Sequence, residues 1–372
     1  MPEIKRILVT GAHGFIGKNL CVRLAELPQF EVLPFGRDDS AENLLALVRK
    51  ADAVVHLAAE NRPKDDEAFI EVNVGLTETL CRLLTSNSRM IPILFASSAQ
   101  AVLNNPYGFS KLRAERTIEG WANETGGSAV IYRLPGVFGK WCRPNYNSVV
   151  ATFCSNVVRG LPLQINAPEK ALQLVYIDDV VAEFVDRLQS LPVGVLQGTV
   201  APEYAITLGE LAQQINAFKD CRTSLQIERV GVGLTRALYA TYVSYLPPEQ
   251  FSYDLPQYGD ERGVFVEMLK TPDAGQFSFF TALPGVTRGG HYHHTKTEKF
   301  LVLKGKARFG FRHIVSQETF ELITNGQTPQ VVETVPGWTH DITNIGEEEM
   351  VVMLWANEIF DRQHPDTIAC KV

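Results

Sequence analysis

Two groups of residues, one near each end of the chain, have types and spacings that can carry out chemistry. The first group combines a glycine-rich turn with a serine, a tyrosine and a lysine: Gly11, Gly14, Gly17, Ser98, Tyr107 and Lys111. The second group combines three histidines with a carboxylate: His291, His293, Glu298 and His340. The first set predicts hydride transfer with a nicotinamide cofactor, and the second predicts a metal site. A function for this chain has to use both.

The glycine-rich turn predicts a dinucleotide site. An apolar run ending in Val9 and Thr10 leads directly into the turn, and a helical pattern follows it at once. Glycines at three-residue spacing let the backbone come close to a pyrophosphate, whose charge lies at the positive N-terminus of the helix. The expected cofactor contacts in this turn are Gly11, Gly14, Phe15, Ile16 and Gly17. A tight turn without a ligand is the alternative.

The choice between NADPH and NADH depends on the residues after the second predicted strand. Arg37 follows Phe35-Gly36 there, at a place where an NAD-specific site has an acid. A guanidinium suits the 2′-phosphate of NADPH, so Arg37 predicts NADPH as the cofactor. The alternative is that Arg37 is an ordinary loop cation and that Asp38 or Asp39 binds the ribose.

The serine, tyrosine and lysine predict reduction of a carbonyl. Tyr107 and Lys111 are four residues apart and share one face of a helix. We expect the ammonium, together with an oxidised nicotinamide, to lower the tyrosine pKa from its usual value near ~10. Tyr107 can then protonate a carbonyl oxygen as hydride reaches the carbon. Ser98, at the end of a predicted strand, can donate a hydrogen bond to the same oxygen. Tyr-x-x-x-Lys also occurs by chance, and Ser98 alone would be read as a helix cap.

The histidine-rich segment predicts a metal centre. His291 and His293 point to the same face of a strand because side chains alternate. Glu298, after a turn, and His340, from a distant strand, complete a set that suits Zn²⁺ or another first-row divalent metal. His294 is a spare ligand that could replace His293 after a small shift in register. A surface histidine cluster without a metal is the alternative.

The elements that position these groups differ between the two halves of the chain. Residues 1 to about 185 alternate short apolar runs with helical spacing, which predicts a parallel sheet covered by helices. The predicted strands are Ile4–Val9, Glu31–Pro34, Ala53–Leu57, Ile91–Ser97 and Val130–Leu134, and the predicted helices are Ile16–Leu27, Glu67–Leu84 and Leu208–Phe218. Beyond Pro247-Pro248 the pattern changes to dense β alternation, as in Lys299–Arg312. We therefore expect an α/β Rossmann-like reductase domain over residues 1–246 and an all-β domain over residues 247–372.

Composition narrows the class of protein. The formal net charge of −7, without a clustered Lys/Arg stripe, argues against a nucleic-acid partner. The glycine turn starts at residue 11, which leaves no room for a signal peptide, and no apolar run approaches ~18 residues. The 6 cysteines have no C-x-x-C spacing and indicate buried thiols in a reducing compartment. We expect a cytoplasmic enzyme with no membrane or nucleic-acid partner.

The first half of the chain resembles the extended short-chain dehydrogenase/reductase family. Besides the glycine turn, it has Leu57-Ala58-Ala59 at the end of a central strand and Asn73 on the next helix. Ser98, Tyr107 and Lys111 match the family's triad. The resemblance implies that Leu57, Ala58, Tyr107 and Lys111 contact the cofactor and that the substrate is a nucleotide-linked sugar. One departure is that only eight residues separate Ser98 from Tyr107, so the loop over the site is short.

The second half resembles the cupin family, which implies a β-barrel. His-x-His-x4-Glu ahead of Gly305, and Pro336-Gly-x-x-His340-x3-Asn344, are similar to the two cupin motifs. A second resemblance competes for the same residues, because Asp260–Glu267 and Arg288–Tyr292 resemble segments of the deoxysugar 3,5-epimerase cupins. Those enzymes use a histidine base, at the position of His291, and no metal. Glu298 favours the metal.

The whole chain, including Phe138–Ser148 and Trp355–Phe360, resembles a family of bifunctional enzymes of bacterial capsule and O-antigen synthesis. This resemblance implies a homodimer that acts on a UDP-linked 4-keto-6-deoxy amino sugar, with C3 inverted in the cupin and the C4 ketone then reduced. The alternative is a sugar-nucleotide dehydratase or epimerase that retains its NAD and has a structural or regulatory cupin. Net cofactor consumption separates the two. A non-catalytic sensor of NADPH and a sugar is disfavoured by the intact triad.

Overall fold

A computed structural model describes residues 4–62, 65, 67–191, 193–256, 258–260, 263–265, 269, 275–358 and 363–372. The chain divides into two compact units. Unit 1 contains Met1–Phe138, Asn145–Ser148 and Leu172–Ala205, and unit 2 contains Gly139–Pro144, Val149–Ala171 and Ile206–Val372. The helices between residues 149 and 243 that belong to unit 2 thus group with the strand-rich half. The domain boundary that the sequence predicts between residues 246 and 247 stays a prediction.

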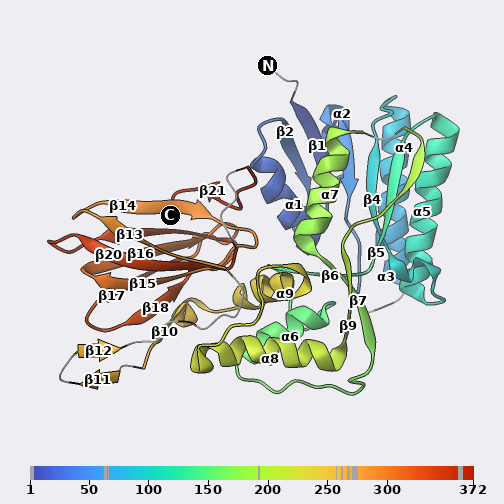
Figure 1. The fold of residues 1–372 in the computed structure, drawn as a ribbon. Helices are drawn as coiled ribbons and strands as arrows, with labels where there is room; N and C mark the ends of the chain where they lie inside the picture. Colours follow the sequence, from blue (N-terminus) through green and yellow to red (C-terminus); the bar gives the residue numbers. More distant parts are fainter. Residues whose placement is uncertain are drawn as a thin grey trace. The chain divides into compact units, whose positions relative to one another are not determined.

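Unit 1 is built on a parallel six-stranded sheet of order β2-β1-β3-β4-β5-β8 (Figure 1). Its strands are β1 (Lys5–Thr10), β2 (Phe30–Phe35), β3 (Ala53–His56), β4 (Ile93–Ser98), β5 (Ala129–Leu134) and β8 (Val195–Gly198). Ile7, Leu8 and Val9 are fully buried, as expected for a sheet covered on both faces. The predicted parallel sheet is confirmed. The order reverses at β1, between β2 and β3, and the carboxyl ends of such strands form the usual ligand crevice.

Helices cover both faces of this sheet. They are α1 (Phe15–Ala25), α2 (Ala41–Lys50), α3 (Glu67–Phe69), the π-type η1 (Ile70–Gly75), α4 (Leu76–Ser86), the short η2 (Ala99–Val102), α5 (Pro106–Thr125) and α7 (Ile177–Gln189). The predicted helix over Glu67–Leu84 is present, but its middle is the wider η1. A small separate sheet joins β6 (Gly136–Phe138), β7 (Ala171–Tyr176) and β9 (Glu203–Thr207).

Unit 2 combines helices with two antiparallel five-stranded sheets (Figure 1). The helices are α6 (Val149–Val158), α8 (Leu208–Ser224), α9 (Gly233–Val243) and η3 (Pro248–Gln250). One sheet has the order β10-β18-β15-β20-β13, with bounds Ser252–Asp254, Gln330–Glu333, Glu298–Lys304, Met350–Ala356 and Gln276–Ala282. The other has the order β17-β16-β19-β14-β21, with bounds Thr319–Asn325, Lys306–His313, Trp338–Asn344, Thr287–Tyr292 and Ile368–Ala369. A short hairpin pairs β11 (Tyr258–Asp260) with β12 (Gly263–Phe265).

The interior of unit 2 is rich in aromatic side chains. Phe300, Phe309, Phe311 and Trp355 are buried, and the rings of Phe300 and Phe309 lie 5.7 Å apart. The alternating segment Lys299–Arg312 forms β15 and β16, which meet at Gly305. The β-rich character of this half is therefore confirmed, whereas its assignment as a cupin stays a prediction. Much of the epimerase-like segment Asp260–Glu267, and Phe360 of the tail motif, lie outside the described residues.

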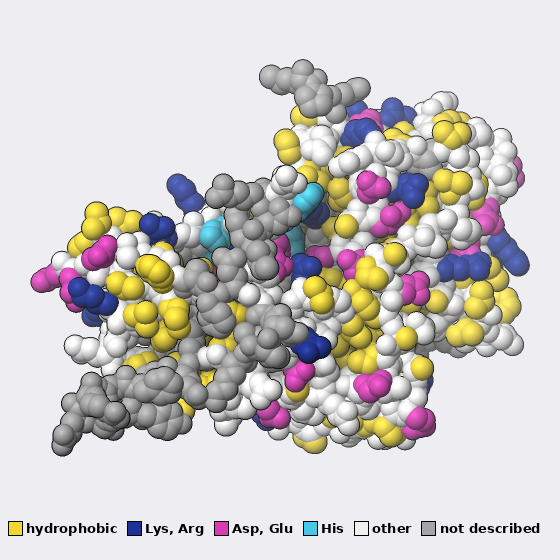
Figure 2. Space-filling view, in the orientation of Figure 1, with side chains coloured by type: hydrophobic (Ala, Val, Ile, Leu, Met, Phe, Trp, Pro, Cys, Tyr) yellow, Lys and Arg dark blue, Asp and Glu magenta, His cyan; other side chains and the backbone are white. Residues whose placement is uncertain are grey.

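On the face shown in Figure 2, cationic and anionic side chains are interspersed with apolar ones, and the described part of that face carries no basic stripe. Among the described residues, no helix combines the length and the apolar character needed to cross a membrane.

Candidate active site and metal centre

The glycine turn lies against the end of β3. A Cβ on Gly11 would lie 2.8 Å from the backbone nitrogen of Ala58, and its φ of +67° also favours glycine. A Cβ on Gly17 would lie 2.2 Å from the carbonyl oxygen of Gly11, so a side chain here would push α1 off the turn. The structure thus brings Gly11, Gly17 and Ala58 together, and α1 starts at Phe15 and Ile16. Backbone amides at this helix N-terminus suit a pyrophosphate.

Two buried residues that the sequence analysis missed hold this crevice in place. Thr10 Oγ1 accepts hydrogen bonds of 3.2 Å from the backbone N–H groups of Leu57 and Ala58. It also lies 2.7 Å from His56 Nδ1, while His56 Nε2 lies 2.9 Å from Thr77 Oγ1. Burial lowers the pKa of His56 to about 3, so its ring is neutral. The sequence did contain a signal for this pair, because Thr10 and His56 are polar residues that each end an apolar strand.

Arg37 lies at the end of β2, with 81% of its side chain exposed. Its guanidinium forms a 2.8 Å ion pair with Glu60, whose other carboxylate oxygen accepts a hydrogen bond of 3.1 Å from Tyr146 Oη. Asp39, one of the two alternative ribose ligands beside Asp38, accepts hydrogen bonds from the backbone N–H of Gly36 (2.7 Å) and from Asn43 Nδ2 (2.8 Å). Both Asp39 oxygens therefore have partners, and Arg37 is held by one exposed ion pair.

Ser98, Tyr107 and Lys111 meet at the carboxyl end of β4. Lys111 is 3% exposed, and its Nζ donates a 2.7 Å hydrogen bond to the carbonyl oxygen of Ala96. Ser98 lowers the pKa of Tyr107, and its Oγ accepts a 3.1 Å hydrogen bond from the backbone N–H of Gln100. The first turn of α5, capped by Asn105, places Tyr107 and Lys111 on one face. The predicted triad residues are thus side by side.

Burial dominates the ionisation of the pair. It raises the pKa of Tyr107, whereas the sequence predicted a lowering by the ammonium and an oxidised nicotinamide, and the interaction with Ser98 offsets part of that rise. Burial also lowers the pKa of Lys111 to about 8, against the attraction of Glu115. Tyr107 therefore holds its proton at neutral pH, as a general acid must before it reacts.

The unusually short loop between Ser98 and Tyr107 packs directly on α5. A Cβ on Gly108 would lie 2.3 Å from the carbonyl oxygen of Gln100 and 2.7 Å from that of Leu103. Glycine at this position lets the loop cross the first turn of the helix.

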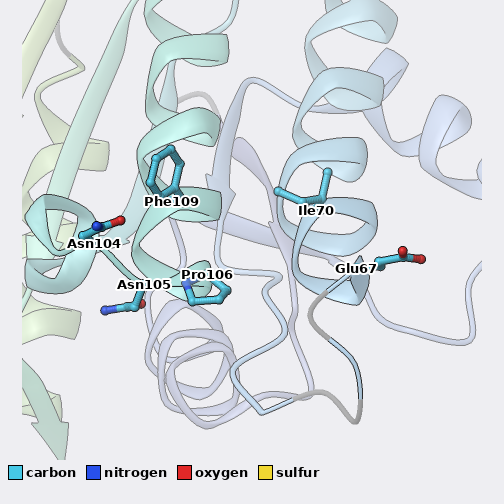
Figure 3. A pocket seen from close by; sticks show the side chains of 6 residues that line it. All are labelled: Glu67, Ile70, Asn104, Asn105, Pro106 and Phe109. Atoms are coloured by element: carbon cyan, nitrogen blue, oxygen red, sulfur yellow. The ribbon is translucent and has the colours of Figure 1, made fainter.

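A hollow of about 500 Å³ lies at the first turn of α5 (Figure 3). It is lined by Glu67, Ile70, Asn104, Asn105, Pro106 and Phe109. Figure 3 shows Ile70 and Phe109 on neighbouring helices, with the hollow between them. None of the triad residues lines it, so this hollow is not assigned to the substrate.

The predicted metal ligands come together in unit 2. His291 on β14 lies directly opposite His340 on β19, and Glu298 begins β15. Among the described residues, His291, His293, Glu298 and His340 place their ligand atoms within 4.8 Å of one another. The ring of His294 instead packs on Tyr292, with centroids 5.6 Å apart, and His294 is not in the group.

The donor atoms of this group fit a metal cation. His293 Nδ1 donates to the carbonyl oxygen of Asp366, which leaves its Nε2 3.1 Å from Glu298 Oε2. A lone pair on Nε2 would repel that carboxylate oxygen, so a proton or a metal ion has to lie between them. His340 is 3% exposed, its Nε2 lies 3.4 Å from Glu298 Oε2, and its Nδ1 has no hydrogen-bond partner. A buried imidazole nitrogen without a partner is costly unless it has a ligand.

The ionisation states are those that bind metals. Burial and the neighbouring His340 and His293 lower the pKa of His291 to about 3, so that ring is neutral. Burial alone would raise the pKa of Glu298, but the hydrogen bond with His293 and the nearby ring of His340 outweigh it and hold that pKa well below its ordinary value. Neutral imidazoles and an ionised carboxylate are the forms that coordinate Zn²⁺.

The group lies at the wall of a second pocket, with a volume of about 180 Å³. The lining comprises His291, Glu298 and His340, the apolar side chains of Phe280, Phe300, Phe309, Ile342 and Leu354, and Arg288, Gly289 and Asp341. A small pocket with convergent polar groups on an otherwise apolar wall is typical of a ligand site.

Sequence comparison relates the whole chain to known proteins. Residues 7–194 match the NAD-dependent epimerase/dehydratase family, and residues 258–368 match the polysaccharide biosynthesis C-terminal domain. A Pseudomonas aeruginosa protein named UDP-2-acetamido-2,6-β-L-arabino-hexul-4-ose reductase is 56% identical over 367 residues, which cover 99% of both chains.

Structure comparison agrees over the same length. The crystal structure of the capsular polysaccharide assembling protein CapF from Staphylococcus aureus is 42% identical, with a TM-score of 0.68, and covers 98% of this chain and 100% of its own. A UDP-glucuronic acid 4-epimerase from Bacillus cereus in complex with NAD is 19% identical, with a TM-score of 0.56. It covers 64% of this chain and 98% of its own, and it shows a shared fold.

Proposed function

Because the chain belongs to the NAD-dependent epimerase/dehydratase family and, over almost its whole length, to the family of the Pseudomonas aeruginosa hexulose reductase, we propose that it is a bifunctional nucleotide-sugar enzyme. Its substrate is a UDP-linked 4-keto-6-deoxy-N-acetylhexosamine. It inverts C3 and then reduces the C4 ketone to give UDP-2-acetamido-2,6-dideoxy-L-talose for capsule or O-antigen synthesis. The observation that carries the proposal is the presence of two clusters of mostly buried reactive side chains in one chain, the serine–tyrosine–lysine triad and the histidine–glutamate cluster.

The order of the two reactions follows from carbonyl chemistry. A ketone at C4 acidifies the hydrogen on C3, because the carbanion left behind is stabilised by the carbonyl. Inversion at C3 must therefore precede reduction, which removes that ketone. Reduction then consumes the inverted ketone, which shifts the reversible inversion toward product.

The reductase chemistry is assigned to Ser98, Tyr107 and Lys111. When bound at the crevice of β1 and β3, NADPH supplies the hydride. Ser98 Oγ donates a hydrogen bond to the C4 carbonyl oxygen, and Tyr107 Oη gives it a proton. The Lys111 ammonium, on the same helix face, stabilises the phenolate that remains.

The proposed cofactor preference is for NADPH. Arg37 is exposed at the end of β2, where its guanidinium can turn to a 2′-phosphate.

The epimerase chemistry is assigned to the pocket in unit 2. His291, His293, Glu298 and His340 would hold one divalent ion, proposed to be Zn²⁺. When bound, such an ion would supply a Lewis acid for the sugar carbonyl, while a base takes the C3 proton and a proton then returns on the opposite face of C3. The apolar wall of the pocket excludes water from the carbanion. The resemblance to the whole-chain family supports a homodimer as the working form.

One incubation tests the proposal. The purified protein is mixed with a UDP-4-keto-6-deoxy-N-acetylhexosamine and NADPH in D₂O, and both nicotinamide absorbance and deuterium at C3 are followed. We expect stoichiometric NADPH oxidation and one deuterium at C3. Turnover without net cofactor consumption would instead show an enzyme that retains NAD, and reduction without deuterium at C3 would remove the epimerase role.

A further inference from the structure

The chain between two of the proposed metal ligands, His293 and Glu298, is held by side-chain hydrogen bonds along its length. Five consecutive backbone N–H groups, from His294 to Glu298, each donate to a side chain from elsewhere in the chain. The acceptors are Asp366 for residues 294–296, Asn357 for Thr297 and Thr334 for Glu298. The first four of these amides precede β15, so without such acceptors these donors would be unsatisfied.

Asp366 makes most of these contacts. Its Oδ1 accepts from the His294 N–H at 2.8 Å, and its Oδ2 accepts from the N–H groups of Thr295 (2.6 Å) and Lys296 (2.7 Å). The Thr295 hydroxyl donates to the same Oδ2 at 3.0 Å. Successive N–H groups converging on one carboxylate form a concave anion-binding turn. Removing the carboxylate would leave three neighbouring N–H groups unsatisfied at once.

The same residue also orients a ligand directly. The carbonyl oxygen of Asp366 accepts the Nδ1–H of His293, which directs Nε2 of that ring toward Glu298. A hydrogen bond at the far nitrogen fixes the tautomer and the orientation of a coordinating imidazole. Asp366 therefore contacts His293 through its backbone carbonyl and residues 294–296 through its side chain.

Lys296 holds the carboxylate of Glu298, at the other end of the segment. The Lys296 ammonium lies 3.3 Å from Glu298 Oε1 and donates to Thr367 Oγ1 at 3.1 Å. Glu298 Oε1 is thus engaged, and Oε2 is the oxygen that faces the imidazoles of His293 and His340. Just beyond Thr367, β21 pairs with β14, the strand that carries His291 (Figure 1).

We propose that Asp366 is the positioning residue of the metal centre, and that its carboxylate sets the spacing between His293 and Glu298. The inference rests on the proposed metal centre and extends it to a residue 72 positions away from His294 in the chain. A ligand loop that is ordered before the ion binds loses little freedom on binding, so the carboxylate slows release of the ion. Partners of this kind typically change metal affinity by about 10- to 100-fold.

The test is the rate at which the full-length protein releases Co²⁺ or Zn²⁺ to excess chelator. Asp366→Ala should release the ion about ten to a hundred times faster than wild type and should alter the visible absorption of the Co²⁺-loaded protein. Asp366→Asn retains one acceptor oxygen and should fall between the two. Val331→Ala is the matched control, because Val331 is fully buried in β18 and belongs neither to the metal group nor to the held segment. It should lower the melting temperature and leave both the release rate and the spectrum unchanged.

The outcomes separate this inference from the function on which it rests. Wild-type protein that binds no divalent ion would overturn the metal centre itself. Wild-type protein that binds one ion, with the same release rate and Co²⁺ spectrum in Asp366→Ala, would overturn the role of Asp366 alone. Equal acceleration in Asp366→Ala and Val331→Ala would show that Asp366 acts only through overall stability.

Discussion

His291 and His340 are direct cross-strand neighbours on β14 and β19, and their ring centroids are 4.7 Å apart. The register shifts between Gly289 and His291, so a β-bulge precedes the histidine. Bulges re-aim side chains and are frequent beside active sites. Here the bulge sets His291 at the wall of the pocket, where it is only half-buried, while His340 is fully enclosed. His291 is thus the ligand most open to an incoming substrate.

His291→Ala should abolish deuterium uptake at C3 while NADPH oxidation continues. The substitution removes either a metal ligand or, if no metal binds, the base. Reduction depends on Ser98, Tyr107 and Lys111 in the other unit, so the product should be the reduced sugar with C3 uninverted. Mass spectrometry of the sugar nucleotide after reaction in D₂O measures both events.

The same variant should lose its divalent ion, which elemental analysis of protein purified without chelator detects. Wild type should hold about one ion per chain, and His313→Ala, which alters a histidine outside the ligand group, should match wild type. A metal-free wild type with full C3 exchange would favour the histidine base. If His291→Ala exchanged and reduced normally, the strand-rich unit would be structural or regulatory.

Tyr107→Phe should reduce the rate of NADPH oxidation by about 10²- to 10⁴-fold, the usual effect of losing a general acid, with cofactor binding nearly unchanged. C3 exchange should persist, because that reaction is assigned to unit 2. Stopped-flow absorbance measures the rate. Tyr132→Phe is the control, since Tyr132 is buried in β5 and donates its hydroxyl proton to Glu183, away from the triad. More than about a tenth of wild-type turnover in Tyr107→Phe would remove Tyr107 from the acid role.

Local spacing made these two sites predictable from the sequence. The glycine turn, the Tyr107–Lys111 pair and the His291–Glu298 motif each lie within a few residues, so the period of a helix or strand is enough to place their side chains. His340 was predictable only because its own Pro-Gly turn and Asn344 resemble a second motif.

Contacts between distant segments were not predictable in this way. Asp366 reaches the ligand loop from 72 positions away, and the partner of Arg37 is Glu60, 23 positions further along the chain. Nothing local to Asp366 marks it as special, since an isolated aspartate before a short strand is an ordinary surface residue. Such residues act through packing and hydrogen bonds that exist only once the strands are paired.

Arg37 leads to a prediction about cofactor selectivity. Wild type should prefer NADPH to NADH, and Arg37→Ala should weaken NADPH selectively, because a guanidinium–phosphate contact is stronger than an exposed ion pair. The ratio of kcat/KM for the two cofactors measures this. Arg113→Ala, which removes an exposed arginine paired with Glu78, should leave the ratio unchanged. Equal efficiency with both cofactors in wild type would contradict the assignment.

The ion pair between Arg37 and Glu60 leads to a related prediction. In the present structure Glu60 holds the Arg37 guanidinium at 2.8 Å, and a 2′-phosphate would have to compete with that carboxylate. Glu60→Gln should therefore tighten NADPH binding severalfold and leave NADH binding nearly unchanged. Fluorescence titration of the two reduced cofactors distinguishes this result from a general change in the site.

Because Lys111 is buried, we predict that its charged ammonium lowers the stability of the unliganded protein. Its pKa falls from 10.5 to about 8 on folding, mainly through burial, so keeping the ammonium charged at pH 7 costs about 3 kcal/mol. Lys111→Met removes that cost and loses one hydrogen bond to the Ala96 carbonyl, worth about 1 kcal/mol. The variant should be inactive in reduction but more stable than wild type by about 2 kcal/mol at pH 7.

This difference in the free energy of unfolding should be constant below pH 8 and disappear between pH 8 and 10.5. Over that range the folded lysine is neutral while the unfolded one still binds a proton. Urea denaturation of both proteins from pH 7 to 10 measures the difference, in which groups common to both proteins cancel. A variant less stable than wild type by the same amount at every pH would show that Lys111 is not strained by burial and contributes as an ordinary packed side chain.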